Sequence, residues 1–173
     1  TENNSVGRAI VQSLDEKLII VGHYDWQPYA IKIDSLGNVI WEQVYDNYPL
    51  LNWLTDIIPV PNEQAYYVYG TTNYNAFNSD ILVAKISDDN GEMLWDTIYD
   101  FGSTFWDYDS KDAAGRITPT QDGGYLAGAL TQGFVQLYQK GTIIKFRSNF
   151  EIIWYNDQIM YQCGPSTVNE LPN

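Results

Sequence analysis

The sequence predicts an all-β fold, a β-propeller built from four-stranded antiparallel blades, of which about three are present. Three observations lead to this fold. One order of apolar runs, turn residues, lysine and tryptophan recurs three times along the chain. Each copy has room for four short strands rich in Val, Ile and Tyr. No segment keeps a helical spacing of apolar residues over three turns.

The repeat is measured by three landmarks in each copy: a glycine that closes an apolar run, a lysine flanked by apolar residues, and a tryptophan. The sets are Gly22, Lys32 and Trp41, then Gly70, Lys85 and Trp95, then Gly128, Lys145 and Trp154. The tryptophans are 54 and 59 residues apart, and the lysines 53 and 60. One unit therefore takes about 50 to 60 residues, which is typical of a propeller blade and too long for an ankyrin or leucine-rich repeat.

Turn chemistry divides each copy into strands. In the first copy we expect strands at Gly7 to Gln12, Lys17 to His23, Tyr29 to Asp34 and Val39 to Tyr45. Glycines such as Gly37 tolerate the positive φ that a tight turn between strands requires. In the third copy Phe150 stands at the matching position, so we expect Asn149 to take the left-handed conformation instead. The unbroken apolar run from Leu18 to Val21 is typical of a strand covered on both faces.

We expect the first blade at residues 1–50, the second at 51–106 and the third at 107–162, followed by a carboxy-terminal segment at 163–173. Propellers typically close with four to eight blades. Three copies therefore predict either part of a longer protein or a ring completed by another chain.

Composition limits the possible partners. Hydrophobic residues make up 45% of the 173 positions, enough for a sizeable core. A net charge of -13 repels phosphate backbones and anionic lipid surfaces, so nucleic acid is not expected as a partner. The uninterrupted apolar runs are only a few residues long, so membrane insertion is not expected either. The single histidine, His23, has no second metal ligand nearby in sequence and is interpreted as a packing or loop residue.

Aromatic residues gather in one set of predicted connections. In a propeller the links between the second and third strands, and between blades, open on the same face. Here they are expected to be long and to carry rings beside Asp, Asn and Gln, a mixture that suits a glycan or a protein partner. The candidate ligand-binding residues are Trp26, Tyr29, Trp53, Tyr74, Phe77, Trp106, Tyr108, Phe134 and Tyr138. The alternative is that each ring plugs a junction between blades.

Three carboxylates, Asp107, Asp109 and Asp112, lie within six residues and could supply oxygen ligands to calcium. Lys111 weakens that hypothesis, and a solvated acidic loop is the alternative. No other cofactor is expected. Carboxylate pairs for glycoside hydrolysis could be drawn from Asp25, Asp56, Asp80, Asp107 and Asp112, but no spacing singles out two of them.

The segment Asp122-Gly123-Gly124-Tyr125-Leu126-Ala127-Gly128, with a later lysine and tryptophan, resembles a repeat of secreted propeller proteins of the Bacteroidota. The first two copies depart from it, with Glu16-Lys17 and Gln64-Ala65 in place of the paired glycines. The last residues, Val168 to Asn173, are similar to the linker before the sorting domain of type IX secretion cargo. This resemblance implies export by the type IX machinery to the outer cell surface or the medium.

The sequence therefore predicts a non-catalytic, secreted or surface-exposed propeller that binds a glycan or a surface protein through its aromatic face. Two alternatives stay open. One is an enzyme that acts on polysaccharide with carboxylates at the centre of the ring, and the other is a structural subunit of a surface assembly.

Overall fold

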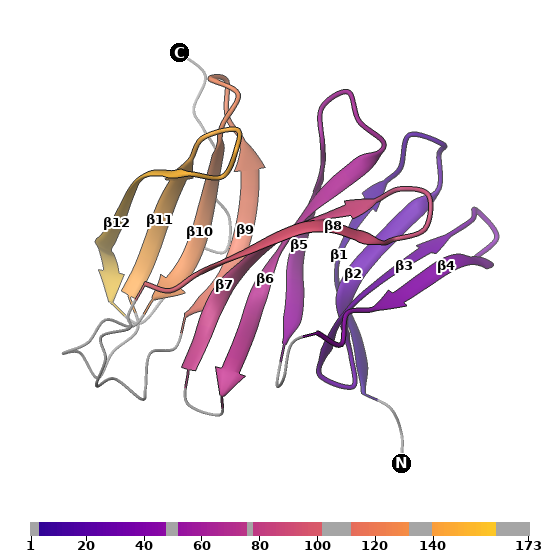
Figure 1. Cartoon of the computed structure of the whole chain (residues 1–173), viewed down its shortest axis with the longest axis horizontal. Helices are drawn as coiled ribbons and strands as arrows, with labels where there is room; N and C mark the ends of the chain where they lie inside the picture. Colours follow the sequence, from indigo (N-terminus) through magenta and orange to yellow (C-terminus); the bar gives the residue numbers. More distant parts are fainter. Residues whose placement is uncertain (1–3, 48–51, 76–77, 102–111, 132–139, 162–173) are drawn as a thin grey trace.

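The computed structural model describes residues 4–47, 52–75, 78–101, 112–131 and 140–161, without the side chains of residues 73–75, 78 and 158–161. These ranges form three four-stranded antiparallel sheets and contain no helix (Figure 1). The predicted all-β fold is thus confirmed. Within the described ranges there is accordingly no helix long and apolar enough to cross a membrane.

Each sheet is built from consecutive strands in chain order. Sheet 1 contains β1 (Ser5–Gln12), β2 (Leu18–Tyr24), β3 (Gln27–Ile33) and β4 (Val39–Val44). Sheet 2 contains β5 (Trp53–Pro59), β6 (Ala65–Asn75), β7 (Asn78–Ser87) and β8 (Met93–Tyr99). Sheet 3 contains β9 (Ala113–Pro119), β10 (Tyr125–Thr131), β11 (Lys140–Phe146) and β12 (Ile152–Tyr161). The expected strands of the first copy agree with the observed ones to within two residues.

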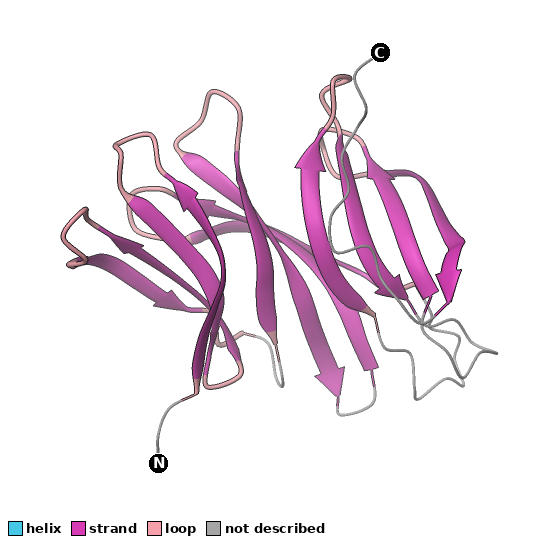
Figure 2. Cartoon of the chain, turned by 180° about the vertical axis from the view of Figure 1, so that it is seen from behind, coloured by secondary structure: helices cyan, strands magenta, loops and turns pink. Residues whose placement is uncertain are grey.

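The sheets stand side by side with sheet 2 in the middle, as both views show (Figures 1 and 2). One apolar core joins sheets 1 and 2, and a second joins sheets 2 and 3. Neighbouring residues of β6 point into different cores, with Val68 in the first and Tyr69 in the second, both fully buried. The central sheet is therefore covered on both faces. In sheet 1, Ile19 and Val21 are buried while Leu18 and Ile20 are only half-buried.

Strand register makes the lysine and tryptophan landmarks equivalent in all three sheets. Lys32 pairs with Trp41, Lys85 with Trp95, and Lys145 with Trp154. Each lysine also reaches an acid in the first turn of its own sheet: Asp15 at 3.1 Å, Glu63, and Asp122 at 2.7 Å, respectively. At this position the lysine ties the third strand of each sheet to its first hairpin.

The glycine landmark holds in only two sheets. Gly22 and Gly70 occupy the same register position in sheets 1 and 2. A Cβ on Gly22 would lie 1.8 Å from the backbone oxygen of Val6, and a Cβ on Gly70 would lie 2.5 Å from that of Trp53. In sheet 3 the equivalent residue is Ala129, paired with Thr142, so Gly128 lies one position too early. The expected equivalence of Gly128 with the other two glycines was wrong.

The turn before each tryptophan contains one residue with positive φ. It is Gly37 (φ 85°) in sheet 1, Gly91 (φ 72°) in sheet 2 and Phe150 (φ 64°) in sheet 3. The expectation that Asn149 takes this role was wrong. The Phe150 ring is 2% exposed and stacks on Tyr125 with centroids 4.7 Å apart. Burial of the ring offsets the roughly 1–2 kcal/mol that a left-handed non-glycine residue costs.

The tryptophan strand of one sheet contacts the turn of the next. The Trp41 indole N–H donates to the backbone oxygen of Asp88 at 2.9 Å, and the Tyr45 hydroxyl donates to the backbone oxygen of Gly91 at 2.7 Å. Between sheets 2 and 3, the Trp95 ring lies 5.7 Å from the Phe150 ring. The Tyr99 hydroxyl donates to the backbone oxygen of Phe150 at 2.6 Å. Both junctions thus use a tryptophan and a tyrosine four residues later.

Candidate functional site

One end of the sheets, the lower end in Figure 1, carries the β2–β3 and β6–β7 hairpins and the starts of β5 and β9. We call this end the lower face. The connections expected to be long loops at Tyr24 to Tyr29 and Thr71 to Asp80 are mostly strand. Pairing continues to Tyr24 opposite Gln27 and to Asn75 opposite Asn78. The expectation of long loops was wrong at these two places, because the backbones keep pairing almost to the hairpin tips.

Trp26 forms a fixed aromatic platform on the lower face. Asp25 and Trp26 make a two-residue turn with φ of 47° and 67°, and the backbone N–H of Asn52 donates to the Trp26 backbone oxygen at 2.8 Å. The indole stacks on the His23 imidazole, with centroids 5.3 Å apart and planes within 5°. The Trp26 residue remains 43% exposed beside this contact.

His23 supports the platform as a neutral ring. It is 2% exposed, and neither ring nitrogen has a hydrogen-bond partner in the described part of the chain. Burial, aided by the charge of Arg8, lowers the pKa of His23 below its usual value. The interpretation of His23 as a packing residue agrees with these contacts, although sequence reasoning did not identify Trp26 as its partner ring.

Two other predicted aromatic residues are held by polar neighbours. The Arg8 guanidinium lies 5.5 Å above the half-buried Trp53 ring, a cation–π arrangement at the start of β5. Tyr29 lies within β3, and its hydroxyl donates to Glu42 at 2.7 Å. Burial together with this hydrogen bond raises the pKa of Tyr29. Trp53 remains a candidate contact on the lower face, whereas Tyr29 belongs to the sheet.

The other predicted site residues cannot be placed as side chains. Tyr74 lies in β6 with its side chain outside the described part. Outside the described residues lie Phe77, Trp106, Tyr108, Phe134 and Tyr138, together with Asp107 and Asp109.

A cluster of carboxylates also lies at the lower face. Asp80 in β7, Asp100 just after β8 and Asp112 just before β9 place one carboxylate oxygen each within 4.8 Å of the others. Asp80 is 7% exposed and Asp112 is fully buried, while Asp100 is exposed. Two unit charges 4 Å apart repel by roughly 4 kcal/mol at an effective dielectric constant near 20. Burial and the charge of Asp100 raise the pKa of Asp80 to about 6.

Backbone contacts hold this cluster in place. The Phe101 N–H donates to Oδ2 of Asp112 at 3.0 Å, and the Asp112 N–H donates to the backbone oxygen of Ser79 at 2.8 Å. Oδ1 of Asp80 is buried without a hydrogen-bond partner among the described residues. The sequence predicted Asp112 as a calcium ligand, but together with Asp107 and Asp109 rather than with Asp80 and Asp100. Asp100 was missed because only the packing of sheet 2 beside sheet 3 brings it close.

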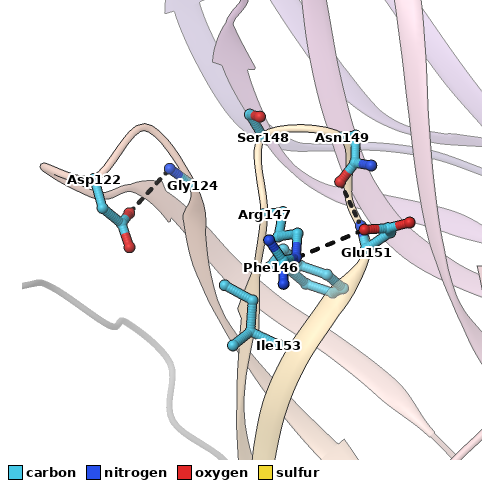
Figure 3. A pocket seen from close by; sticks show the side chains of 8 residues that line it. All are labelled: Asp122, Gly124, Phe146, Arg147, Ser148, Asn149, Glu151 and Ile153. Atoms are coloured by element: carbon cyan, nitrogen blue, oxygen red, sulfur yellow. Dashed lines mark hydrogen bonds and ion pairs between the residues drawn. The ribbon is translucent and has the colours of Figure 1, made fainter.

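A separate cavity of 460 Å³ lies on sheet 3 between the β9–β10 and β11–β12 turns (Figure 3). Its lining consists of Asp122, Gly124, Phe146, Arg147, Ser148, Asn149, Glu151 and Ile153. None of these is a predicted site residue. Asp122 corresponds in the repeat to Asp15, and Lys32, which binds Asp15, also binds Asp88 of sheet 2 at 3.0 Å. The cavity therefore lies at the place on sheet 3 that corresponds to the place where sheet 1 contacts sheet 2.

Comparisons with known proteins add no family to this description. No protein-family model matches the sequence, and no curated protein matches it.

Proposed function

We propose that this chain is part of a secreted or cell-surface β-propeller, exported by type IX secretion, which binds a glycan or a protein partner without catalysis. The observation that carries the binding function is the Trp26 platform, an exposed indole that is fixed on the lower face by backbone pairing and by the His23 ring.

The repeated junction supports the propeller part of this proposal. Trp41 with Tyr45, and Trp95 with Tyr99, contact the next sheet in the same way. The last strand of sheet 3 and the last turn of sheet 1 carry the tryptophan and the turn glycine of this contact, without a neighbouring sheet against them in the described part of the chain. Trp154 is 47% exposed, and a Cβ on Gly37 would have no atom within 4 Å. Further sheets of this repeat would cover both surfaces and continue the ring.

A fixed indole suits a flat, hydroxyl-rich ligand. The apolar face of a sugar ring stacks on an aromatic plane, while nearby carboxylates and amides bind its hydroxyl groups. Because the Trp26 backbone is held by Asn52 and its ring by His23, little conformational entropy is lost on binding. The same platform would serve as the aromatic anchor of a protein interface.

The binding experiment has two arms: a glycan array, and a pull-down from envelope extracts. We expect binding in one arm to be lost in Trp26→Ala and weakened in Trp53→Ala. Trp154→Ala is the matched control, because that exposed indole lies on sheet 3, away from the Trp26 platform. Binding that survives Trp26→Ala but falls in Trp154→Ala would reject the lower face. Absence of binding in both arms would reject the proposed binding function.

Export is tested by locating the protein in cells that express it. Antibodies against the chain should detect the protein in the medium or on intact cells. A protein found only in the soluble interior would contradict secretion.

One alternative is an enzyme that acts on polysaccharide, for which Asp80, with its raised pKa, would supply one carboxyl group. Turnover of a polysaccharide panel that is abolished by Asp80→Asn would favour the enzyme over the binding module. A structural subunit, the remaining alternative, would instead purify with a stoichiometric partner.

A further inference from the structure

The Asp80, Asp100 and Asp112 cluster occupies a junction that the chain builds twice. Asp112 immediately precedes the first strand of sheet 3 and donates its N–H to the backbone oxygen of Ser79 at 2.8 Å. Asn52 immediately precedes the first strand of sheet 2 and donates its N–H to the backbone oxygen of Trp26 at 2.8 Å. Trp26 and Ser79 both lie six residues before the repeat lysine, so the two contacts are equivalent.

The side chains differ between the two junctions. Counted from the repeat lysine and tryptophan, Asp80 corresponds to Gln27 and Asp100 to Asp46. The first junction thus holds two amides and one carboxylate, and the second holds three carboxylates. The backbone contact forms in both cases, so the fold of the junction does not require the extra negative charges.

The burial of Asp80 points to a bound ion. Asp80 is 93% buried, and its Oδ1 has no hydrogen-bond partner among the described residues. Oε1 of Gln27, at the same position of the first junction, is also buried without a partner among them, but it belongs to a neutral amide. A buried oxygen of this kind is costly unless a donor or a cation meets it. The three carboxylates offer oxygens within 4.8 Å of one another. That is the separation expected for oxygens around one ion with ligand distances of about 2.3–2.6 Å.

We propose that Asp80, Asp100 and Asp112 bind one calcium ion, which ties the start of β7 and the end of β8 to the start of β9. Calcium is favoured because the donors are all carboxylate oxygens, without histidine or cysteine among them. Exposed Asp100 leaves room for water to complete the coordination. The site would fasten sheet 2 to sheet 3, as the Lys32–Asp88 pair fastens sheet 1 to sheet 2.

The experiment uses the whole chain after removal of metals by a chelator. Calcium binding is measured by isothermal titration, and the melting temperature is recorded with calcium, with magnesium and with chelator. We expect saturating calcium to raise the melting temperature by several degrees, and magnesium to raise it less. Asp80→Asn should reduce calcium affinity at least tenfold and remove the shift. Asp46→Asn, at the position of the first junction that corresponds to Asp100, should leave both unchanged.

Asp80→Asn without calcium should be folded and no less stable than the metal-free parent, since it removes one of three clustered charges. A loss of calcium binding in Asp80→Asn would then result from the missing carboxylate and not from unfolding. Absence of calcium binding by the parent chain would overturn the proposal. So would equal calcium affinity in Asp80→Asn and the parent, because the ion would then bind elsewhere.

Discussion

The indole N–H of Trp41 donates to the backbone oxygen of Asp88, 47 positions later in the chain, at 2.9 Å. Trp41 lies on the last strand of sheet 1 and Asp88 in the last turn of sheet 2. The same side of that turn receives the Tyr45 hydroxyl at Gly91 and the amide of Gln43 at Asn90. A turn on one sheet is therefore the contact site for the tryptophan strand of its neighbour, and the first, second and fourth predictions test this arrangement.

The first prediction concerns the glycines of these turns. A Cβ at Gly91 would lie 2.6 Å from Cζ3 of Trp41, whereas a Cβ at Gly37 would meet nothing within 4 Å. Both residues have positive φ, so alanine is strained at each by about 1 kcal/mol. Gly91→Ala should lower the free energy of unfolding by about 2–4 kcal/mol and Gly37→Ala by about 1 kcal/mol. Equal losses in urea titrations of the two variants would contradict the docked position of Trp41.

The second prediction compares two repeat lysines. Lys32 is 3% exposed and binds Asp88 of the neighbouring sheet, itself 6% exposed. Lys85 pairs with Glu63, whose side chain is 51% exposed. Lys32→Met leaves a buried carboxylate without its cation and should cost about 3–5 kcal/mol. Lys85→Met should cost at most about 1 kcal/mol. Chemical denaturation measures both, and a larger loss in Lys85→Met would contradict the role assigned to Lys32.

The third prediction is a pH dependence caused by His23. Because burial lowers its pKa in the folded state, the unfolded chain takes up a proton more readily. The stabilisation from neutral His23 is present above pH 6.5 and is lost as the pH falls through the folded-state pKa. Asp80, whose pKa is raised to about 6, acts in the opposite direction. The difference between the parent and His23→Phe isolates the histidine.

We therefore expect the free energy of unfolding to fall more steeply in the parent than in His23→Phe between pH 7 and pH 5. Phenylalanine keeps a ring against Trp26, so the platform should remain. Parallel pH curves would mean that His23 has the same pKa in the folded and unfolded chains, and would contradict its burial as a neutral ring.

Lysine and tryptophan positions made the three four-stranded sheets predictable from sequence, because each residue occupies the same register position in every sheet. Lysine pairs with an acid of the first turn, and tryptophan lies opposite it on the last strand. Glycine was a weaker guide. At Gly22 and Gly70 a close backbone approach excludes a side chain, yet sheet 3 accepts Ala129 at the same position.

Phe150 shows why turn chemistry alone failed in sheet 3. Local preference favours Asn over Phe at positive φ. The aromatic ring nevertheless reaches a cluster with Tyr67, Tyr125 and Trp95 that only the packed sheets create. Tertiary burial overrode the local preference. The carboxylate cluster escaped prediction for a similar reason, because Asp80, Asp100 and Asp112 are brought together by pairing and packing across 33 positions of the chain.

The fourth prediction tests the repeated tryptophan contact most directly, by comparing Trp41→Phe with Trp154→Phe in urea titrations followed by circular dichroism. The two residues occupy the same repeat position, but Trp41 is 8% exposed and donates to Asp88, whereas Trp154 is 47% exposed. Trp41→Phe should lower the free energy of unfolding by about 1–3 kcal/mol, and Trp154→Phe by less than about 0.5 kcal/mol. Equal effects, or no effect at Trp41, would contradict sheet-to-sheet docking through this indole.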